Sequence, residues 1–146
     1  MAQPVFAFPY QVSWHDLDSN NHMRNSRYQD YASQTRLRYL SERGFTPAHF
    51  ETHGIGPVVL EEKIQYRREL RFLEPFRVEI ALGGMNASGS KFILVNRILR
   101  EDGGLSANVT ALGAWLDLRE RRICMPPPAL MDAMSSLPRT EDYRGL

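Results

Sequence analysis

Residues 58 to 118 form a nearly continuous series of strand-like segments, and this series limits the possible folds more than any other feature of the chain. Apolar side chains alternate in VVLEEKIQYRREL, FRVEIAL and LSANVTALGAWLDL, whereas KFILVNRIL is more continuously apolar. Such patterns predict strands with at least one buried face. Short turn sequences separate the segments: FLEP at 72–75, NASGS at 86–90 and EDGG at 101–104. Connections of this length make neighbouring strands antiparallel.

One strand and one long helix are predicted before this series. Apolar side chains alternate from Phe6 to Trp14, and Pro9, on the opposite parity, indicates an edge position or a bulge near the start of the strand. Helical spacing follows for about five turns and ends at Gly44. One helix face has Tyr28, Tyr31, Ala32, Thr35, Tyr39 and Leu40, and the polar face has Arg27, Gln29, Arg36 and Arg38. This pattern predicts a helix packed on a sheet.

The order of elements predicts a single α+β domain over residues 1–146, with the helix on one face of a curved, antiparallel five-stranded sheet. One helix cannot cover both faces of five long strands, so we expect the chain to dimerise. Residues 47–57 are expected to form a connecting loop with one helical turn. The tail from about residue 119, apart from a short helix in ALMDAM, is expected to be partly irregular and to lie on the surface.

Composition limits the environment and the partners. The net charge is +1, from 18 basic and 17 acidic residues, so electrostatics give no reason to expect a nucleic-acid partner. No apolar run approaches the roughly 20 residues that span a bilayer, and the N-terminus lacks the pattern of a secretory signal. The only cysteine, Cys124, cannot form an internal disulfide. We therefore expect a cytoplasmic protein without a membrane partner.

Polar residues are concentrated just before the helix. The segment from His15 to Asn25 contains two histidines, three asparagines and two aspartates. Asp and Asn are preferred in helix caps and turns, but capping needs only one such residue. A functional site at the helix start is therefore a second hypothesis, and it is compatible with helix capping by one of these residues. His15, Asp16, Asp18 and His22 are residue types that can bind a metal, but no HExxH or CxxC spacing supports such a site, so no metal is predicted.

The stretch DLDSNNHMRNSRY, between the first strand and the helix, resembles the signature of the hot-dog fold acyl-CoA thioesterases of the 4-hydroxybenzoyl-CoA thioesterase type. The residues that match are Trp14, Asp16, Asp18, His22, Asn25 and Tyr28. The stretch is also similar to the D-x-N-x-H pattern of acyl-ACP thioesterases, through Asp18, Asn20 and His22. The sequence departs from the family in having Asn21 where many relatives have Gly and Arg24 where many have Asn.

The resemblance implies an enzyme that hydrolyses an acyl thioester. It also implies a homodimer, and both a dimer and a tetramer of two dimers are compatible with the sequence. It assigns Asp18 as nucleophile or general base, and it assigns the backbone amide near Asn25 to polarise the thioester carbonyl. Asn20 is expected to orient Asp18 or water, and His22 to hold water or the thioester. Asp16, nearer the strand end, is expected to have a structural role.

The acyl group of the substrate is expected to be carried by coenzyme A, with an acyl carrier protein as the alternative carrier. Phosphates need nearby cations and donors, and Arg67, Arg68, Ser90 and Lys91 flank the turns where relatives bind the coenzyme. No Gly-rich loop opens a helix, so no dinucleotide site is indicated, and no cofactor beyond the coenzyme A of the substrate is expected.

The sequence also has features that bear on two alternative functions. An enoyl-CoA hydratase of the same fold would have Asp and His five apart in D-x-N-P-x-H, whereas Asp18 and His22 are four apart without a proline. A non-catalytic acyl-CoA-binding protein is the remaining alternative. His49 and His53 are expected to be packing or surface residues. Of Glu61 and Glu62, only one can face the buried side, as a second carboxylate or, more simply, in a salt bridge.

Overall fold

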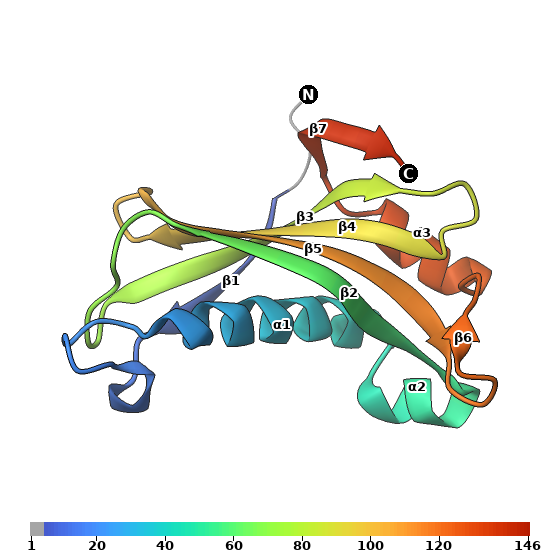
Figure 1. Ribbon diagram of the computed structural model, residues 1–146, viewed down its shortest axis with the longest axis horizontal. Helices are drawn as coiled ribbons and strands as arrows, with labels where there is room; N and C mark the ends of the chain where they lie inside the picture. Colours follow the sequence, from blue (N-terminus) through green and yellow to red (C-terminus); the bar gives the residue numbers. More distant parts are fainter. Residues whose placement is uncertain (1–4) are drawn as a thin grey trace.

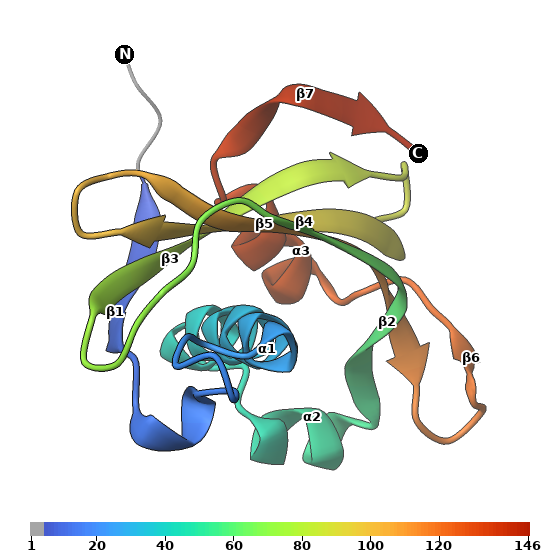
Figure 2. The ribbon, with the colours of Figure 1, turned by 60° about the vertical axis from the view of Figure 1, so that its left-hand side comes forward.

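The structure, a computed structural model, describes residues 5–146 and confirms the predicted α+β architecture. Helix α1 (Asn25–Glu42) lies along one face of a curled antiparallel sheet (Figure 1). The main strands are β1 (Phe6–Gln11), β2 (Ile55–Tyr66), β3 (Pro75–Met85), β4 (Lys91–Arg100) and β5 (Leu105–Asp117). Figure 2 shows the sheet wrapping around α1. The buried side of the sheet is thus the side that holds the helix.

The strand order β1-β3-β4-β5-β2 leaves β1 and β2 at the two edges. Pro9 lies in edge strand β1, as the sequence predicts, where its missing N–H costs no ladder hydrogen bond. Strand β2 pairs with β5 and has a bulge between Val59 and Glu61. Because side chains alternate along a strand, Glu62 faces α1, whereas Glu61 and Lys63 face away from it.

The buried face of α1 contains the residues that helical spacing predicts: Tyr28, Tyr31, Ala32, Thr35, Tyr39 and Leu40. Gly44, with φ of 90°, follows the helix, as a stop residue in the left-handed region should. The prediction for Arg36 is wrong: it was expected on the polar, solvent-facing side of the helix, but its side chain is buried. It donates to the Asn96 side chain at 2.8 Å and to Glu62 at 2.8 Å, so its charge is paired inside the protein.

Residues 47–57 are more regular than predicted. Helix α2 (Pro47–His53) begins after Thr46, whose hydroxyl accepts from the backbone N–H of His49 at 3.2 Å, and it ends at Gly54, with φ of 67°. The rings of His49 and His53 stack at 4.0 Å on one face of this short helix. Strand β2 then begins at Ile55, earlier than the predicted residue 58.

The tail also differs from the prediction of a partly irregular surface segment. It forms β6 (Arg122–Ile123), the expected short helix as α3 (Pro128–Ser135), and β7 (Arg139–Gly145), which pairs parallel with β3 beyond the end of β1. Leu130 and Met134 of α3 are fully buried, and the Tyr39 hydroxyl of α1 donates to the Ala133 carbonyl at 2.6 Å. Tertiary contacts of this kind, which a local sequence pattern does not reveal, order the tail.

Candidate active site

The loop from β1 to α1 is anchored by Asp16. This residue ends the 3-10 turn η1 (Trp14–Asp16), and its side chain is fully buried. It accepts hydrogen bonds from the backbone N–H of Ser13 at 2.9 Å, from Arg27 Nε at 2.6 Å and from the Tyr31 hydroxyl at 2.6 Å. The two bonds from α1 tie the loop to the helix. Asp16 therefore has the structural role that the sequence predicts.

These contacts change the protonation behaviour of both partners. Burial alone would raise the pKa of Asp16, but hydrogen bonds from Tyr31, Ser13 and Arg27 together hold this pKa below its ordinary value. Burial and the hydrogen bond to the Asp16 carboxylate raise the pKa of Tyr31 to about 12. Asp16 is thus an anionic acceptor at neutral pH, and Tyr31 is a permanent donor to it.

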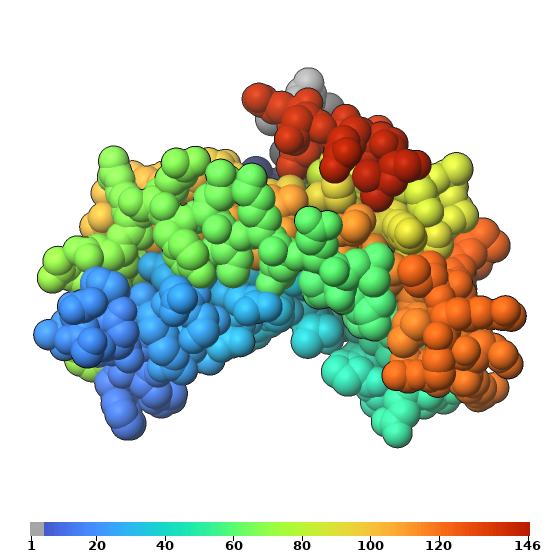
Figure 3. Space-filling model, viewed as in Figure 1, coloured from blue at the N-terminus to red at the C-terminus, as the bar shows by residue number. Residues whose placement is uncertain are grey.

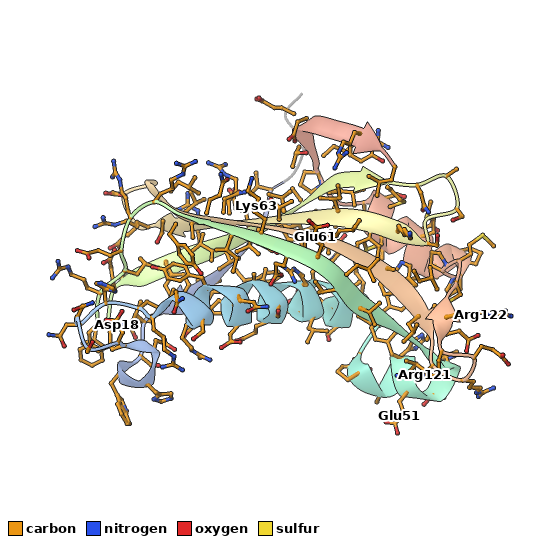
Figure 4. The ribbon with its side chains drawn as sticks, viewed as in Figure 1. Asp18, Glu51, Glu61, Lys63, Arg121 and Arg122 are labelled. Carbon is orange, nitrogen blue, oxygen red and sulfur yellow. The ribbon has the colours of Figure 1, made fainter. Side chains whose placement is uncertain are left out.

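Asp18, two residues later, is partly open to solvent and is held by a tight turn. Its Oδ1 accepts from the Asn20 backbone N–H at 2.8 Å, and its Oδ2 lies 3.0 Å from Nδ1 of His22. The turn needs Asn21 at φ of 61°, a left-handed conformation that Asn tolerates and glycine favours. The side chain of Asp18 is 27% exposed, enough for a substrate to reach it. Figure 4 shows Asp18 in this loop, at one end of the molecule.

His22 lies between two carboxylates. Its Nδ1 faces Asp18, and its Nε2 lies 3.9 Å from Glu69 Oε2. The Nδ1 contact with the Asp18 carboxylate is a hydrogen bond when this nitrogen holds the proton. It orients the ring so that Nε2 lies on the side of Glu69.

The start of α1 lies beside this pair. Arg24 is the N-cap and Asn25 the first helical residue, with its carbonyl accepting from the Tyr66 hydroxyl at 3.1 Å. The loop and cap hydrogen bonds of residues 5–146 include no acceptor for the Asn25 N–H, as expected for the first turn of a helix. This N–H also lies at the positive end of the helix dipole. It is a free donor for a developing negative charge.

One surface pocket of about 300 Å³ brings most of these groups together. Asp18, His22 and Asn25 line it with Arg67 and Arg68, which follow the end of β2. The sequence-predicted residues from two distant segments thus meet. Tyr28, Tyr66 and Glu69, which were not predicted to line a site, complete the wall with Met23.

Three of the residues predicted for the site, Asn20, Ser90 and Lys91, do not line this pocket. Asn20 is exposed and outside the pocket lining, and it is the backbone N–H, not the side chain, that contacts Asp18. Ser90 and Lys91 lie at the β3–β4 turn, at the opposite end of the sheet from the Asp18 loop (Figure 1). Ser90 is bonded to the Asn86 side chain within this turn. Within a single chain, Ser90 and Lys91 are therefore separate from the Asp18 pocket.

A second cavity, of about 180 Å³, was missed by sequence reasoning. It lies between the second half of α1 and the start of β2, and its wall is almost entirely apolar. The residues that line it are Ser33, Arg36, Leu37, Leu40, Pro57, Val58, Val59, Phe92, Leu94, Ala111, Gly113 and Trp115. Leu37 and Val59 are 42% and 54% exposed, so the cavity opens beside the free edge of β2. Its residues come from four elements, α1, β2, β4 and β5, and no local sequence pattern reveals such a cavity.

The sequence of residues 12–134 matches the family model of the thioesterase-like superfamily. The chain belongs to this superfamily. The matched range includes the Asp18 loop, α1 and strands β2 to β5. The predicted family resemblance is thereby confirmed at the level of the superfamily.

Solved structures share the fold at low sequence identity, which supports the hot-dog architecture predicted for this superfamily member. A hypothetical protein from Staphylococcus aureus, solved in complex with CoA, is 21% identical, with a TM-score of 0.85 over 92% of this chain and 84% of that one. A 1,4-dihydroxy-2-naphthoyl-CoA thioesterase from Synechocystis is 16% identical, with a TM-score of 0.81 over 90% and 96%. A gentisyl-coenzyme A thioesterase is 18% identical, with a TM-score of 0.76 over 86% and 98%.

Two further observations concern the part of this thioesterase-like chain that the structure describes. No helix in residues 5–146 is both long and apolar enough to cross a membrane. Over the same residues, no three His, Cys, Asp or Glu side chains are grouped so that they could hold a metal ion.

Proposed function

We propose that the chain is an acyl-CoA thioesterase in which Asp18 is the essential catalytic group. The observation that supports this most directly is the pocket lined both by Asp18, a partly exposed and oriented carboxylate, and by Asn25, whose N–H at the start of α1 has no acceptor within the described residues. Hydrolysis of a thioester needs an activated water or a nucleophile, together with donors for the carbonyl oxygen as it becomes negative. The pocket offers a candidate group for each requirement, Asp18 for the first and the Asn25 N–H for the second.

In the proposed reaction the thioester carbonyl oxygen accepts a hydrogen bond from the Asn25 N–H. Water adds to the carbonyl carbon as Asp18 takes its proton, the carbon–sulfur bond breaks, and the proton passes to the thiolate, which leaves the free acid and coenzyme A. Attack by Asp18 through an anhydride gives the same products. ¹⁸O found in the Asp18 carboxylate after a single turnover in ¹⁸O water would identify the anhydride route, because the general-base route places the label only in the free acid.

His22 orients Asp18 in either route. Its Nδ1–H donates to Asp18 Oδ2 at 3.0 Å, and its Nε2, when unprotonated, can accept a hydrogen bond from the attacking water. Asn20 contributes to the orientation through its backbone N–H at 2.8 Å. We therefore propose His22 as a catalytic residue and Asn20 as a positioning residue.

We propose that the coenzyme A part of the substrate binds at Arg67 and Arg68. Both side chains are exposed at the pocket, and neither forms an ion pair within residues 5–146. Such guanidinium groups bind phosphate through paired, charge-assisted hydrogen bonds. The Staphylococcus aureus protein was solved with CoA, and the two thioesterases named above act on CoA thioesters. An acyl carrier protein remains the alternative carrier of the acyl group.

The test of the proposed function is thiol release from a panel of short, long and aromatic acyl-CoA thioesters. Replacing Asp18 by Asn keeps an oxygen acceptor for the turn but removes the base, so kcat should fall by about 10² or more. Asp142→Asn, at an exposed carboxylate of β7, is the matched control and should leave kcat unchanged. Undiminished turnover in a folded Asp18→Asn variant would exclude Asp18 from the mechanism, and tight binding of every acyl-CoA without turnover would favour the acyl-binding alternative.

A further inference from the structure

Two neighbouring loops expose large apolar side chains at one end of the molecule. Trp14 in η1 is 72% exposed, and Phe72 and Leu73, in the turn between β2 and β3, are 50% and 54% exposed. Backbone hydrogen bonds join the two loops, because Val12 accepts from the Leu73 N–H at 3.0 Å and donates to the Glu74 carbonyl at 3.1 Å. Figure 3 shows both loops at the same end, η1 in blue and the turn in green. Apolar side chains that are grouped in this way mark an interaction surface.

The backbone at Leu73 indicates that the exposed side chain has a function. Its φ of 64° lies in the left-handed region, which glycine adopts freely and larger residues rarely adopt. The side chain is 54% exposed, so it gains little burial within the chain in return for this strain. Glycine would fit the turn better, yet the chain has leucine here. A strained residue at an exposed turn is a reason to expect a role in binding.

The charges of residues 67–74 leave two cations beside this apolar surface. Both acidic residues of the segment are already paired with arginines, Glu69 at 2.6 Å and Glu74 at 3.1 Å. Arg67 and Arg68 are exposed, and neither forms an ion pair within residues 5–146. The segment therefore has an excess of positive charge, which favours a partner with negative charge.

We propose that this end of the chain binds the surface of an anionic lipid bilayer. Trp14, Phe72 and Leu73 enter the headgroup region, where tryptophan, with its apolar ring and polar N–H, is especially favoured. The two free arginines attract the anionic headgroups over about 10 Å in 0.1 M salt, so they need not leave the pocket that they line. Binding of this kind strengthens with the apolar area inserted and with the negative charge of the lipid.

The size of the apolar surface favours a lipid over a protein partner. A stable protein interface buries about 800 Å² on each partner and involves about 20–30 residues, far more than two turns supply. Insertion into a bilayer, by contrast, depends on a few side chains. It also needs no membrane-spanning segment, so the expectation of no membrane partner, which rested on the absence of a long apolar run and of a secretory signal, does not apply to such a contact.

Binding through this end also brings the candidate active site to the bilayer, an extension that rests on the proposed function. Arg67 and Arg68, in the same segment, line the Asp18 pocket. A thioester with a long acyl chain is amphiphilic and partitions into bilayers, so an enzyme bound in this way would meet its substrate there. Hydrolysis of a long-chain acyl-CoA in vesicles should therefore slow in a variant that no longer binds them. Hydrolysis of a short-chain acyl-CoA in solution should not change.

The variant Leu73→Gly separates lipid binding from folding. Glycine relieves the strain at φ of 64°, so the urea midpoint of unfolding should not fall. Loss of the inserted side chain should raise the dissociation constant for vesicles of phosphatidylcholine and phosphatidylglycerol, measured by co-sedimentation, by about tenfold. Arg121→Gly, at an exposed residue with φ of 56° at the other end of the molecule (Figure 4), is the matched control for the backbone. Met125→Gln, at a side chain that is 69% exposed, is the control for apolar surface. Both controls should bind vesicles as the wild type does.

The fluorescence of Trp14 reports insertion directly, because the only other tryptophan, Trp115, is fully buried. Vesicles that contain phosphatidylglycerol should shift the emission to shorter wavelength, vesicles of phosphatidylcholine alone should shift it less, and Trp14→Gln should abolish the shift. No lipid binding by the wild type, or undiminished binding by Leu73→Gly, would overturn the proposal. A changed sedimentation coefficient of Leu73→Gly with unchanged lipid binding would also overturn it, since this end would then contact a second copy of the chain. Because binding is measured without substrate, its failure is distinguishable from failure of the proposed activity.

Discussion

Asp16 and Asp18 are two residues apart, yet their surroundings give them different chemistry. Asp16 is fully buried among donors from the loop and α1, whereas Asp18 is partly exposed at a pocket. A carboxylate whose acceptor sites are all occupied inside the protein stabilises a fold but cannot reach a substrate. The accessible one is the candidate for catalysis.

Replacing Asp16 by Asn should lower the free energy of unfolding by about 2–3 kcal/mol at pH 7, because charge-assisted bonds from Arg27 and Tyr31 are weakened in a buried site. The folded pKa of Asp16 lies below its ordinary value of 3.8, so its contribution is present above that value and is lost as the pH falls through the folded pKa. The stability difference between wild type and variant should thus be constant near neutral pH and shrink below about pH 4.

Urea unfolding at a series of pH values measures this difference. Asp30→Asn is the control, because Asp30 contacts the same Arg27 at 2.7 Å but is 56% exposed, and an exposed pair adds little stability. A difference between wild type and Asp16→Asn that grows as the pH falls would contradict the assignment.

The cations of the pocket give a second prediction at this scale. Replacing Arg67 and Arg68 together by Ala should raise KM for an acyl-CoA by about tenfold, because charge-assisted contacts to phosphate are lost. The KM for the same acyl group on N-acetylcysteamine, which has no phosphate, should not change. Arg121→Ala serves as a control for the loss of surface charge. An equal rise in KM for both substrates would show that these arginines do not bind the coenzyme phosphates.

Sequence reasoning identified some residues of the site and not others, for a physical reason. Asp18, His22 and Asn25 lie in one short segment whose composition is itself unusual, and Arg67 and Arg68 follow a strand that returns to this end of the sheet. Ser90 and Lys91 lie at the other end of the chain's own sheet. Their predicted role came from the family resemblance, and a contribution to a substrate site would require the partner's pocket.

At the scale of elements, Arg36 joins α1 to two strands. It bonds Glu62 of β2 and Asn96 of β4, and both members of the Arg36–Glu62 pair have side chains only 10% exposed. Removal of one partner leaves a buried charge, so Arg36→Leu should destabilise the fold by about 3 kcal/mol. Adding Glu62→Gln to this variant should recover part of the loss, and a double-mutant cycle from urea unfolding measures the coupling. Additive effects would mean that the two groups do not interact.

Elements with a strong internal period were predictable, and those ordered by tertiary contacts were not. Helix α1 and strands β3 and β5 repeat their apolar residues over eleven or more positions, and strand β4 is apolar over most of its ten residues. Strand β7, by contrast, is mostly polar and is defined by pairing with β3, and α2 is a seven-residue helix fixed by Thr46 and Gly54. A period-based analysis also assigned Arg36 to the solvent face, because a buried ion pair looks polar in the sequence.

At the scale of the whole molecule, the two pockets lie at opposite ends of β2, and this separation gives the last prediction. Asp18→Asn removes the base but keeps the apolar cavity, and Ser33→Phe fills the cavity from α1 but keeps the base. If, in the homodimer that the sequence predicts, the acyl group of each site lies in the partner's cavity, a mixed dimer has one intact site and one doubly defective site. Two inactive variants that exchange subunits at random should then regain about one quarter of wild-type activity. If each chain used its own cavity, every site would keep one defect and the mixture would stay inactive, so thiol release before and after mixing decides between the two arrangements.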